Sequence, residues 1–226
     1  MKALIFDSGT LINLSMNGLL YILEGLKDDS DIRFLITPSV KYEIIDRPIN
    51  VPRFELGALR VKDLLEKGVL QLPDSLKISS KELDVKTKEF LEIANNLLKI
   101  NGSPLKIVSE GEMSCLALSE ILFSQNIENI IGVDERTTRT LCESPKDLSK
   151  MISARIHKKV EIASDNVNLF SKYEIVRSSE IILAAYKKGV IKIQGSKVLE
   201  ALLYATKFKG SSISYEEINF LKKMVK

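Results

Sequence analysis

The chain alternates between short apolar runs and longer segments that carry one apolar face. The short runs predict buried strands, which are Lys2–Phe6, Arg33–Thr37, Val69–Leu72 and Ile130–Val133. The longer segments predict helices, which are Leu11–Leu26, Phe54–Glu66, Lys81–Ile100 and Glu110–Ser124, with a further helix beginning at Thr37-Pro38. Strands that alternate with helices form parallel βαβ units. The sequence therefore predicts an α/β protein with three layers, α/β/α, around a central parallel sheet.

The pattern changes at Ser144. Ser144-Pro145 predicts a short helix, and Lys158–Ala163 with Asn168–Val176 predicts an inserted β-hairpin whose second arm can also supply the last sheet strand. Three more segments are expected to be helical, and they are Glu180–Lys188, Ser196–Phe208 and Ser214–Val225. We divide the chain into a core (1–143), a basic insertion (144–172), the last core strand and helix (173–195) and a helical C-terminal tail (196–226).

Composition narrows the class of protein. The chain has 226 residues, 45% of them hydrophobic, which is enough for a substantial core. No apolar run approaches the roughly 20 residues that span a bilayer, and no signal-peptide pattern opens the sequence, so we expect a cytoplasmic protein without a membrane partner. Cys115 and Cys142 lack zinc-site spacing. His157 is the only histidine, which argues against a His-based metal site or a Ser-His-Asp triad.

Charge is distributed unevenly along the chain. Residues 1–145 carry 17 Lys/Arg against 22 Asp/Glu, a net charge of −5, whereas residues 146–226 carry 16 against 8, a net charge of +8. A basic part beside an acidic part suits an enzyme that binds a polyanion and cuts it. The alternative is a solvated basic face without a nucleic-acid partner.

Four acidic residues stand at the ends of predicted elements. Asp7 follows the first strand, Glu43 lies one turn inside the helix after Pro38, Glu112 begins another helix, and Asp134 follows the strand Ile130–Val133. Because ligand sites in open α/β sheets lie at the carboxyl ends of the strands, these acids can meet at one edge. Such a cluster is costly unless a cation neutralises it, and Mg²⁺ prefers oxygen ligands.

Each acid also has a structural alternative. Asp7 and Asp134 fit helix N-caps, Glu43 fits an exposed helix face, and Ser109 with Glu112 fits a capping box. Arg136 and Arg139 follow Asp134 on one helix face. They can contact a phosphate or form ordinary helix salt bridges.

The segment Asp7-Ser8-Gly9-Thr10 first suggests a haloacid-dehalogenase-type phosphatase, whose opening motif is D-x-D-G-T. Aligning Gly9-Thr10 on that motif puts Phe6 and Ser8 where the two aspartates belong. The nucleophile and the acid/base of that family would both be missing, so we reject this assignment.

The chain instead resembles the PIN-domain nucleases, particularly the prokaryotic and archaeal type. Their motifs are a strand ending in D-[ST]-[SG]-x-L-I, a TP-x-V-x-x-E segment, a GE that enters an Ala/Leu-rich helix, and D-[DE]-R-x-x-R after a strand. The corresponding segments here are Asp7–Ile12, Thr37–Glu43, Gly111-Glu112 and Asp134–Arg139, in the same order. The resemblance covers about residues 1–143 and resumes at Tyr173–Ile191.

This resemblance implies a Mg²⁺- or Mn²⁺-dependent ribonuclease. Its implied catalytic metal ligands are Asp7, Glu43, Glu112 and Asp134, with Glu110 and Glu135 as competitors for the last two positions. Ser8 or Thr10 would be the hydroxyl that orients the cluster. Many relatives are toxins of toxin–antitoxin pairs and others are RNA-processing factors, so a small antitoxin or an RNA-processing partner is an implied alternative to RNA alone.

The segment Ser144–Lys172 has no counterpart in the compact toxins of that family. Five basic residues of this segment are expected to bind RNA, and they are Lys146, Lys150, Arg155, Lys158 and Lys159. Three alternatives stay open from the sequence: a non-catalytic RNA-binding or assembly factor that keeps the fold, a nuclease that also cuts DNA, and a homodimer.

Overall fold

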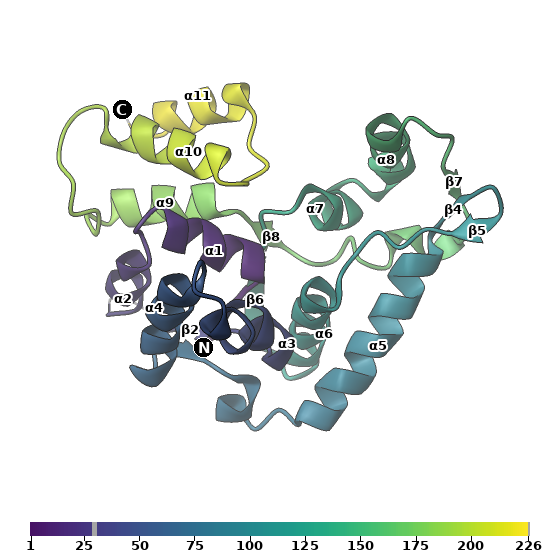
Figure 1. Cartoon of the computed structure of the whole chain (residues 1–226), viewed down its shortest axis with the longest axis horizontal. Helices are drawn as coiled ribbons and strands as arrows, with labels where there is room; N and C mark the ends of the chain where they lie inside the picture. The colour runs from purple at the N-terminus through teal and green to yellow at the C-terminus, as the bar shows by residue number, and fades with distance from the viewer. Residues whose placement is uncertain (29–30, 226) are drawn as a thin grey trace.

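A five-stranded parallel sheet forms the centre of the molecule in the computed structural model, which describes residues 1–28 and 31–225 (Figure 1). The strand order is β3-β2-β1-β6-β8, and every neighbouring pair is parallel. The strands are β1 (Lys2–Phe6), β2 (Ile32–Leu35), β3 (Leu70–Gln71), β6 (Glu128–Gly132) and β8 (Ile175–Val176). The predicted α/β class with a central parallel sheet is therefore confirmed.

Helices cover both faces of this sheet. On one face α6 packs on β1 and β6, and α5 packs on α6; on the other face α1 and α2 pack against α9. These helices are α1 (Ser8–Met16), α2 (Tyr21–Asp28), α5 (Ser80–Asn96), α6 (Glu110–Ser124) and α9 (Ser178–Lys187). Between β2 and β3 the chain forms α3 (Pro38–Lys41), the π-helix η1 (Tyr42–Asp46), the 3-10 helix η2 (Pro48–Asn50) and α4 (Glu55–Glu66).

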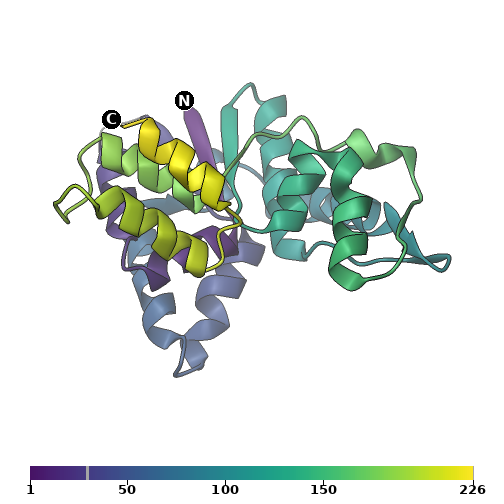
Figure 2. The ribbon, with the colours of Figure 1, turned by 90° about the horizontal axis from the view of Figure 1, so that it is seen from above.

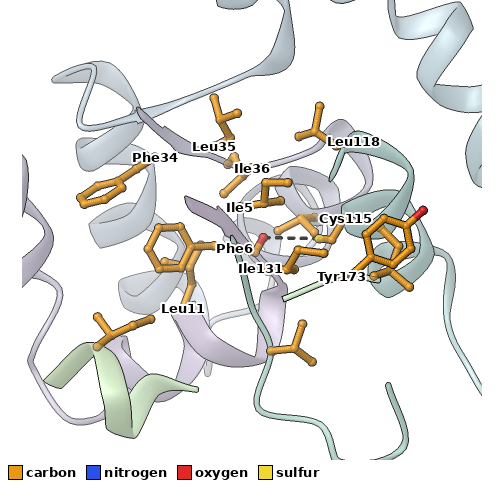
Figure 3. Close-up of a cluster of buried hydrophobic side chains, with 14 of the residues drawn as sticks. Ile5, Phe6, Leu11, Phe34, Leu35, Ile36, Cys115, Leu118, Ile131 and Tyr173 are labelled. Atoms are coloured by element: carbon orange, nitrogen blue, oxygen red, sulfur yellow. Dashed lines mark hydrogen bonds between the residues drawn. The ribbon is translucent and has the colours of Figure 1, made fainter. Parts of the chain in front are cut away.

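The core fills the space between the sheet and its helices. Phe6 and Phe34 contact each other edge to face, with ring centroids 5.6 Å apart. Cys115 of α6 is fully buried, and its thiol donates to the carbonyl oxygen of Phe6 at 3.6 Å (Figure 3). The first turns of α6 are thereby fixed against the carboxyl end of β1.

Two predicted helices end earlier than expected. The segment Leu11–Leu26 is divided into α1 and α2, because Gly18 adopts a left-handed conformation (φ +68°) just after Asn17 closes α1. The segment Lys81–Ile100 is helical only to Asn96. Its last residues form β4 (Leu98–Ile100), which pairs antiparallel with β5 (Ser103–Pro104).

Asn101 and Gly102 connect these two short strands. Both have positive φ, 50° and 81°, which is the backbone twist of a tight hairpin turn. The Asn-Gly pair therefore forms a hairpin turn, and its prediction as a helix stop is wrong.

The predicted hairpin in the basic insertion is wrong, because its two arms pair with different partners. β7 (Glu161–Ile162) pairs antiparallel with β4 and completes a second, three-stranded sheet of order β5-β4-β7. Between the arms lies the 3-10 helix η5 (Asp165–Asn168), and the second arm supplies only β8 of the main sheet. β4 pairs with β5 on one edge and with β7, the first arm, on its other edge. The first arm therefore pairs with β4 and not with the second arm.

The rest of the insertion is helical. It follows α7 (Arg136–Glu143) and consists of the 3-10 helix η4 (Pro145–Asp147) and α8 (Leu148–Ile156). A further 3-10 helix, η3 (Pro73–Leu76), precedes α5. Figure 2 shows the α7–α8 unit and the C-terminal helices on opposite sides of the centre of the molecule.

The C-terminal tail forms α10 (Val198–Phe208) and α11 (Tyr215–Lys223). The predicted capping box is confirmed: Glu217 N–H donates to Ser214 Oγ at 3.0 Å, and Ser214 N–H donates to Glu217 at 2.7 Å. A small apolar cluster joins these helices to α9 through Leu183, Leu203 and Ile218. Across residues 1–28 and 31–225, no helix combines the length and apolar character that crossing a membrane requires.

Candidate functional site

Asp7 and Asp134 stand at the carboxyl ends of two neighbouring strands. Phe6 pairs with Gly132 in the β1–β6 register, and the Asp7 N–H donates to the Gly132 carbonyl at 2.9 Å. Asp7 also caps α1, since its Oδ2 accepts from Gly9 N–H at 3.2 Å. Asp7 and Asp134 are each only 3% exposed. The N-cap interpretation of Asp7 is thus correct, and it uses one oxygen of the carboxylate.

Asp134 is held through one oxygen as well. Its Oδ1 accepts three hydrogen bonds, from Ser178 N–H at 2.9 Å, Ser178 Oγ at 3.0 Å and Ser211 Oγ at 3.0 Å. Asp134 is not the N-cap of the next helix. Glu135 caps α7, since it accepts from Thr138 N–H at 2.9 Å.

Glu43 reaches the site from the π-helix η1. The N–H of Arg47 donates to the Tyr42 carbonyl at 3.0 Å, which is the wider i to i−5 pattern often found at functional sites. A Cβ added at Gly111 would lie 2.7 and 2.8 Å from the two Glu43 carboxylate oxygens. The Glu43 carboxylate therefore lies directly against the first turn of α6, at its electropositive end.

Glu112 lies in the same turn and is 8% exposed. Its Oε2 accepts from Ser109 N–H at 2.6 Å and from Ser109 Oγ at 2.8 Å, which confirms the capping box. Its Oε1 accepts from Thr138 Oγ1 at 2.7 Å. Thr138 therefore connects Glu112 to Glu135, because its hydroxyl donates to Glu112 and its N–H donates to Glu135.

Burial and neighbouring negative charges raise the pKa values of these carboxyl groups. Burial, together with the negative charges of Glu112 and Glu43, raises the pKa of Asp7 to about 7. Burial also raises the pKa of Glu112 against the lowering effect of its hydrogen bonds, and the same holds for Asp134. The mutual repulsion of Asp7, Glu43 and Glu112 indicates that these three carboxylates share one small region.

Unpartnered buried oxygens gather at this edge of the sheet. Among the described residues, the fully buried side-chain oxygens without a hydrogen-bond partner are Asp7 Oδ1, Thr10 Oγ1 and Asp134 Oδ2. Thr10 contacts the end of β6, since its Cγ2 is 3.6 Å from a Cβ built at Gly132. An unpaired buried polar group is rare in native proteins and calls for an explanation such as an ion or a water. All three belong to the acidic site predicted from the sequence.

The donor set suits a hard divalent cation. Carboxylate and hydroxyl oxygens are the ligands that Mg²⁺ prefers, and Mg²⁺ keeps several waters while it binds one or two carboxylates. Within the described part of the chain, no three acidic, Cys or His side chains are already arranged around a common metal position. Asp7 and Asp134 each keep one oxygen free, which fits a site completed by water and substrate oxygens.

The structure distinguishes Glu112 and Asp134 from Glu110 and Glu135, the acids that compete with them for the two ligand positions. Glu110 is exposed, and its Oε1 accepts from Ser39 Oγ at 3.3 Å, away from Asp7. Glu135 lies near Glu112 but is engaged in capping α7 and lies 3.9 Å from Arg155. Glu112 and Asp134 are more deeply buried than these neighbours. Of the two candidate hydroxyls, Thr10 is buried at the site, whereas Ser8 is half-buried.

The predicted phosphate-binding residues have different positions. Arg139 is engaged elsewhere, donating to Ser212 Oγ at 2.8 Å and to Glu143 at 2.8 Å, so the salt-bridge interpretation fits it. Arg136 and Lys158 are exposed, and Lys159 pairs with Glu161 at 2.8 Å.

Arg155 of the insertion contacts the segment that follows Asp134. Its guanidinium donates to Thr137 Oγ1 at 3.2 Å, at the start of α7, and its side chain is 54% exposed. Three residues that the sequence did not point to also hold carboxylates of the site. Thr138 donates to Glu112, and Ser178 and Ser211 donate to Asp134. Hydroxyl residues are too common to be recognised from one sequence, and only Thr138, one turn beyond Asp134, offered a positional signal.

Gly111 gives a direct test of the Glu43 placement. We expect Gly111→Ala to displace the Glu43 carboxylate, because the new methyl would clash with both of its oxygens. Unfolding free energy should be unchanged or rise by up to about 1 kcal/mol, because alanine favours a helix over glycine. Metal affinity should fall about 10-fold. Urea unfolding and calorimetric titration with Mn²⁺ measure the two effects, and Gly57→Ala in α4 serves as a helix-glycine control.

In comparisons with known proteins, the chain matches no protein-family model, no curated protein and no solved structure.

Proposed function

We propose that this protein is a metal-dependent endoribonuclease of the PIN type, which hydrolyses RNA phosphodiesters with a metal-activated water. One observation carries the proposal. The unpartnered buried oxygens of the described chain, on Asp7, Thr10 and Asp134, are all at the carboxyl edge where four acids were predicted to bind metal. Structural capping accounts for the other oxygen of Asp7, and hydrogen bonds from Ser178 and Ser211 account for that of Asp134.

The PIN resemblance is supported by where its four motifs lie. The first and last motifs follow the adjacent strands β1 and β6. The second motif begins at the N-cap Thr37, whose hydroxyl is 2.6 Å from Ser114 Oγ on α6. This contact joins the helix that carries Glu43 to the helix that carries Gly111 and Glu112.

Each residue has a distinct role in the proposed reaction. Asp7 and Asp134 offer their free oxygens, while Glu112 and Glu43 complete the negative field around them. Together these residues would hold a divalent cation, which would lower the pKa of a bound water and stabilise the departing oxygen. Thr138 holds Glu112 in place, and the α6 N-terminus keeps the Glu43 carboxylate close to Gly111. These contacts fix the carboxylates before substrate arrives, which is the form of preorganisation that catalysis requires.

The α8 side of the site offers positive charge for the RNA backbone. The insertion carries six exposed basic residues, and they are Lys146, Lys150, Arg155, Lys158, Lys159 and Lys172. We expect Arg155→Glu to weaken RNA binding and to reduce the slope of log affinity against log salt by about one, as the loss of one phosphate contact does. Filter binding between 50 and 300 mM KCl measures it. Lys81→Glu, on the remote first turn of α5, should leave the slope unchanged, and an equal effect of both variants would contradict the assignment.

The function is tested by cleavage of a labelled single-stranded RNA with purified protein. We expect cleavage with Mg²⁺ or Mn²⁺, none with EDTA, and recovery after excess metal is added. A DNA strand of the same sequence tests the choice of nucleic acid. RNA binding without metal uptake by calorimetry would instead support a non-catalytic RNA-binding factor, and it would overturn the proposal.

A further inference from the structure

The C-terminal tail supplies a buried hydroxyl to a residue of the acidic site. Ser211 lies in the loop between α10 and α11, is 4% exposed, and donates from Oγ to Asp134 Oδ1 at 3.0 Å. The next residue in the loop adds a backbone bond, from Ser212 N–H to the Asp134 carbonyl at 3.3 Å. The tail thus contacts Asp134 through both its side chain and its main chain.

The loop conformation is specified by its own sequence. Gly210 has a φ of +113°, a conformation that residues with a side chain rarely adopt. Ser211 N–H then donates to the Thr206 carbonyl at 3.1 Å, and Ile213 is buried in the tail cluster. These features turn the chain at the end of α10 and direct Ser211 toward Asp134.

Buried polar contacts fasten the loop to the core. Arg139 donates to the Ser212 carbonyl at 3.0 Å, and Arg177 donates to the same carbonyl at 3.3 Å and to Glu217 of α11 at 2.7 Å. At the other end of the loop, the Asn13 side chain donates to the Thr206 carbonyl at 2.9 Å. α1, α7 and α9, which all surround the acidic site, therefore each hold the tail.

The pattern of hydrogen bonds on Asp134 explains what the tail does. Ser178 and Ser211 all donate to Oδ1, which leaves Oδ2 buried and unpartnered. Hydrogen bonds to one oxygen of a carboxylate fix the orientation of the group, and they thereby set the direction in which the other oxygen points. Removing the Ser211 hydroxyl would leave the carboxylate with the two hydrogen bonds from Ser178 and would loosen its orientation.

We propose that Ser211 is a positioning residue that orients Asp134 for metal binding, so that the C-terminal tail is a part of the active site. The proposal rests on the proposed function, because it needs Asp134 to bind the cation. Outer hydrogen-bond partners of metal ligands typically change metal affinity by about 10–100-fold. Since Ser178 still holds Asp134, we place the effect of Ser211 at about 10-fold.

Calorimetric titration of the full chain with Mn²⁺ at 20 °C tests this inference. Ser211→Ala should raise the Mn²⁺ dissociation constant about 10-fold. Ser212→Ala, which removes an Arg139 contact from the same loop, should change it less than about twofold. Circular dichroism melts without metal show whether each variant is folded at that temperature.

The outcomes separate the two proposals. Equal Mn²⁺ affinity of wild type and Ser211→Ala, with a lower melting temperature of the variant, would make Ser211 merely structural and overturn this inference alone. An equal loss of affinity in both serine variants would also overturn it, because tail docking rather than the hydroxyl would be responsible. Absence of Mn²⁺ binding by wild type would overturn the proposed function and this inference together.

Discussion

Asp7→Asn is expected to abolish metal-dependent RNA cleavage, lowering the rate by at least about 100-fold. The substitution replaces the free, buried carboxylate oxygen or its partner by an amide nitrogen, which cannot bind a cation. Loss of an outer hydrogen-bond partner already costs 10–100-fold, and loss of a ligand should cost no less. Single-turnover cleavage of a labelled RNA with saturating Mg²⁺ measures the effect.

The same variant should be more stable than wild type without metal. Asparagine caps a helix as well as aspartate does, so α1 keeps its first turn. The variant also avoids ionising a buried carboxyl whose pKa is raised to about 7. We expect a gain of about 1–3 kcal/mol in unfolding free energy at pH 8.

Asp84→Asn is the matched control, because Asp84 is exposed on α5. It should leave both cleavage and stability within error of wild type. Cleavage by Asp7→Asn at the wild-type rate would point to a contaminating nuclease or to a site elsewhere. If Asp7→Asn is inactive and also less stable than wild type, Asp7 has only the structural role of a helix cap.

The stability of the metal-free protein should fall as pH rises from about 4 to about 7. The pKa of Asp7 is raised from its unfolded value of 3.8 to about 7, so the folded state keeps a proton that the unfolded state has lost. The stabilisation by this proton is complete below the unfolded pKa and is lost as pH rises through the folded one. For Asp7 the loss is on the order of 4 kcal/mol.

Comparison with Asp7→Asn isolates this contribution. Glu112 and Asp134 also have raised pKa values and act in the same direction, while Glu217 has a lowered pKa and acts in the opposite one. These groups are present in both proteins, so the difference between them reports on Asp7 together with its repulsion of Glu112 and Glu43. Urea unfolding in EDTA at pH values between 4.5 and 8 measures it. Parallel pH profiles for the two proteins would show that Asp7 is not buried as a carboxylate.

The sequence was most informative where local rules and packing agree. β1, α6 and the Ser214 capping box follow from apolar runs and cap residues whose preferences the sheet and core reinforce. The Asn101-Gly102 pair shows the limit, because the same two residues end a helix or turn a hairpin depending on whether Leu98–Ile100 finds a partner strand. Strand pairing between distant segments is not encoded in local periodicity.

The same limit applies to the site. Asp7 and Asp134 were found because strand ends in a parallel sheet lie at one edge, which is a topological rule. Ser178 and Ser211 were missed because they reach Asp134 from 44 and 77 residues away, through the packing of α9 and the tail. The helical C-terminal tail thus supplies Asp134 with a hydrogen bond that only the folded chain reveals.

The central claim is that Asp7, Glu43, Glu112 and Asp134 together bind a divalent cation at one edge of the sheet. Crystals soaked in Mn²⁺ and measured for anomalous scattering test it most directly. We expect a peak about 2.1 Å from oxygens of Asp7 and Asp134, with Glu43 and Glu112 bound directly or through water. No peak at the carboxyl ends of β1 and β6 at millimolar Mn²⁺, or a peak only at other surface carboxylates, would contradict the account.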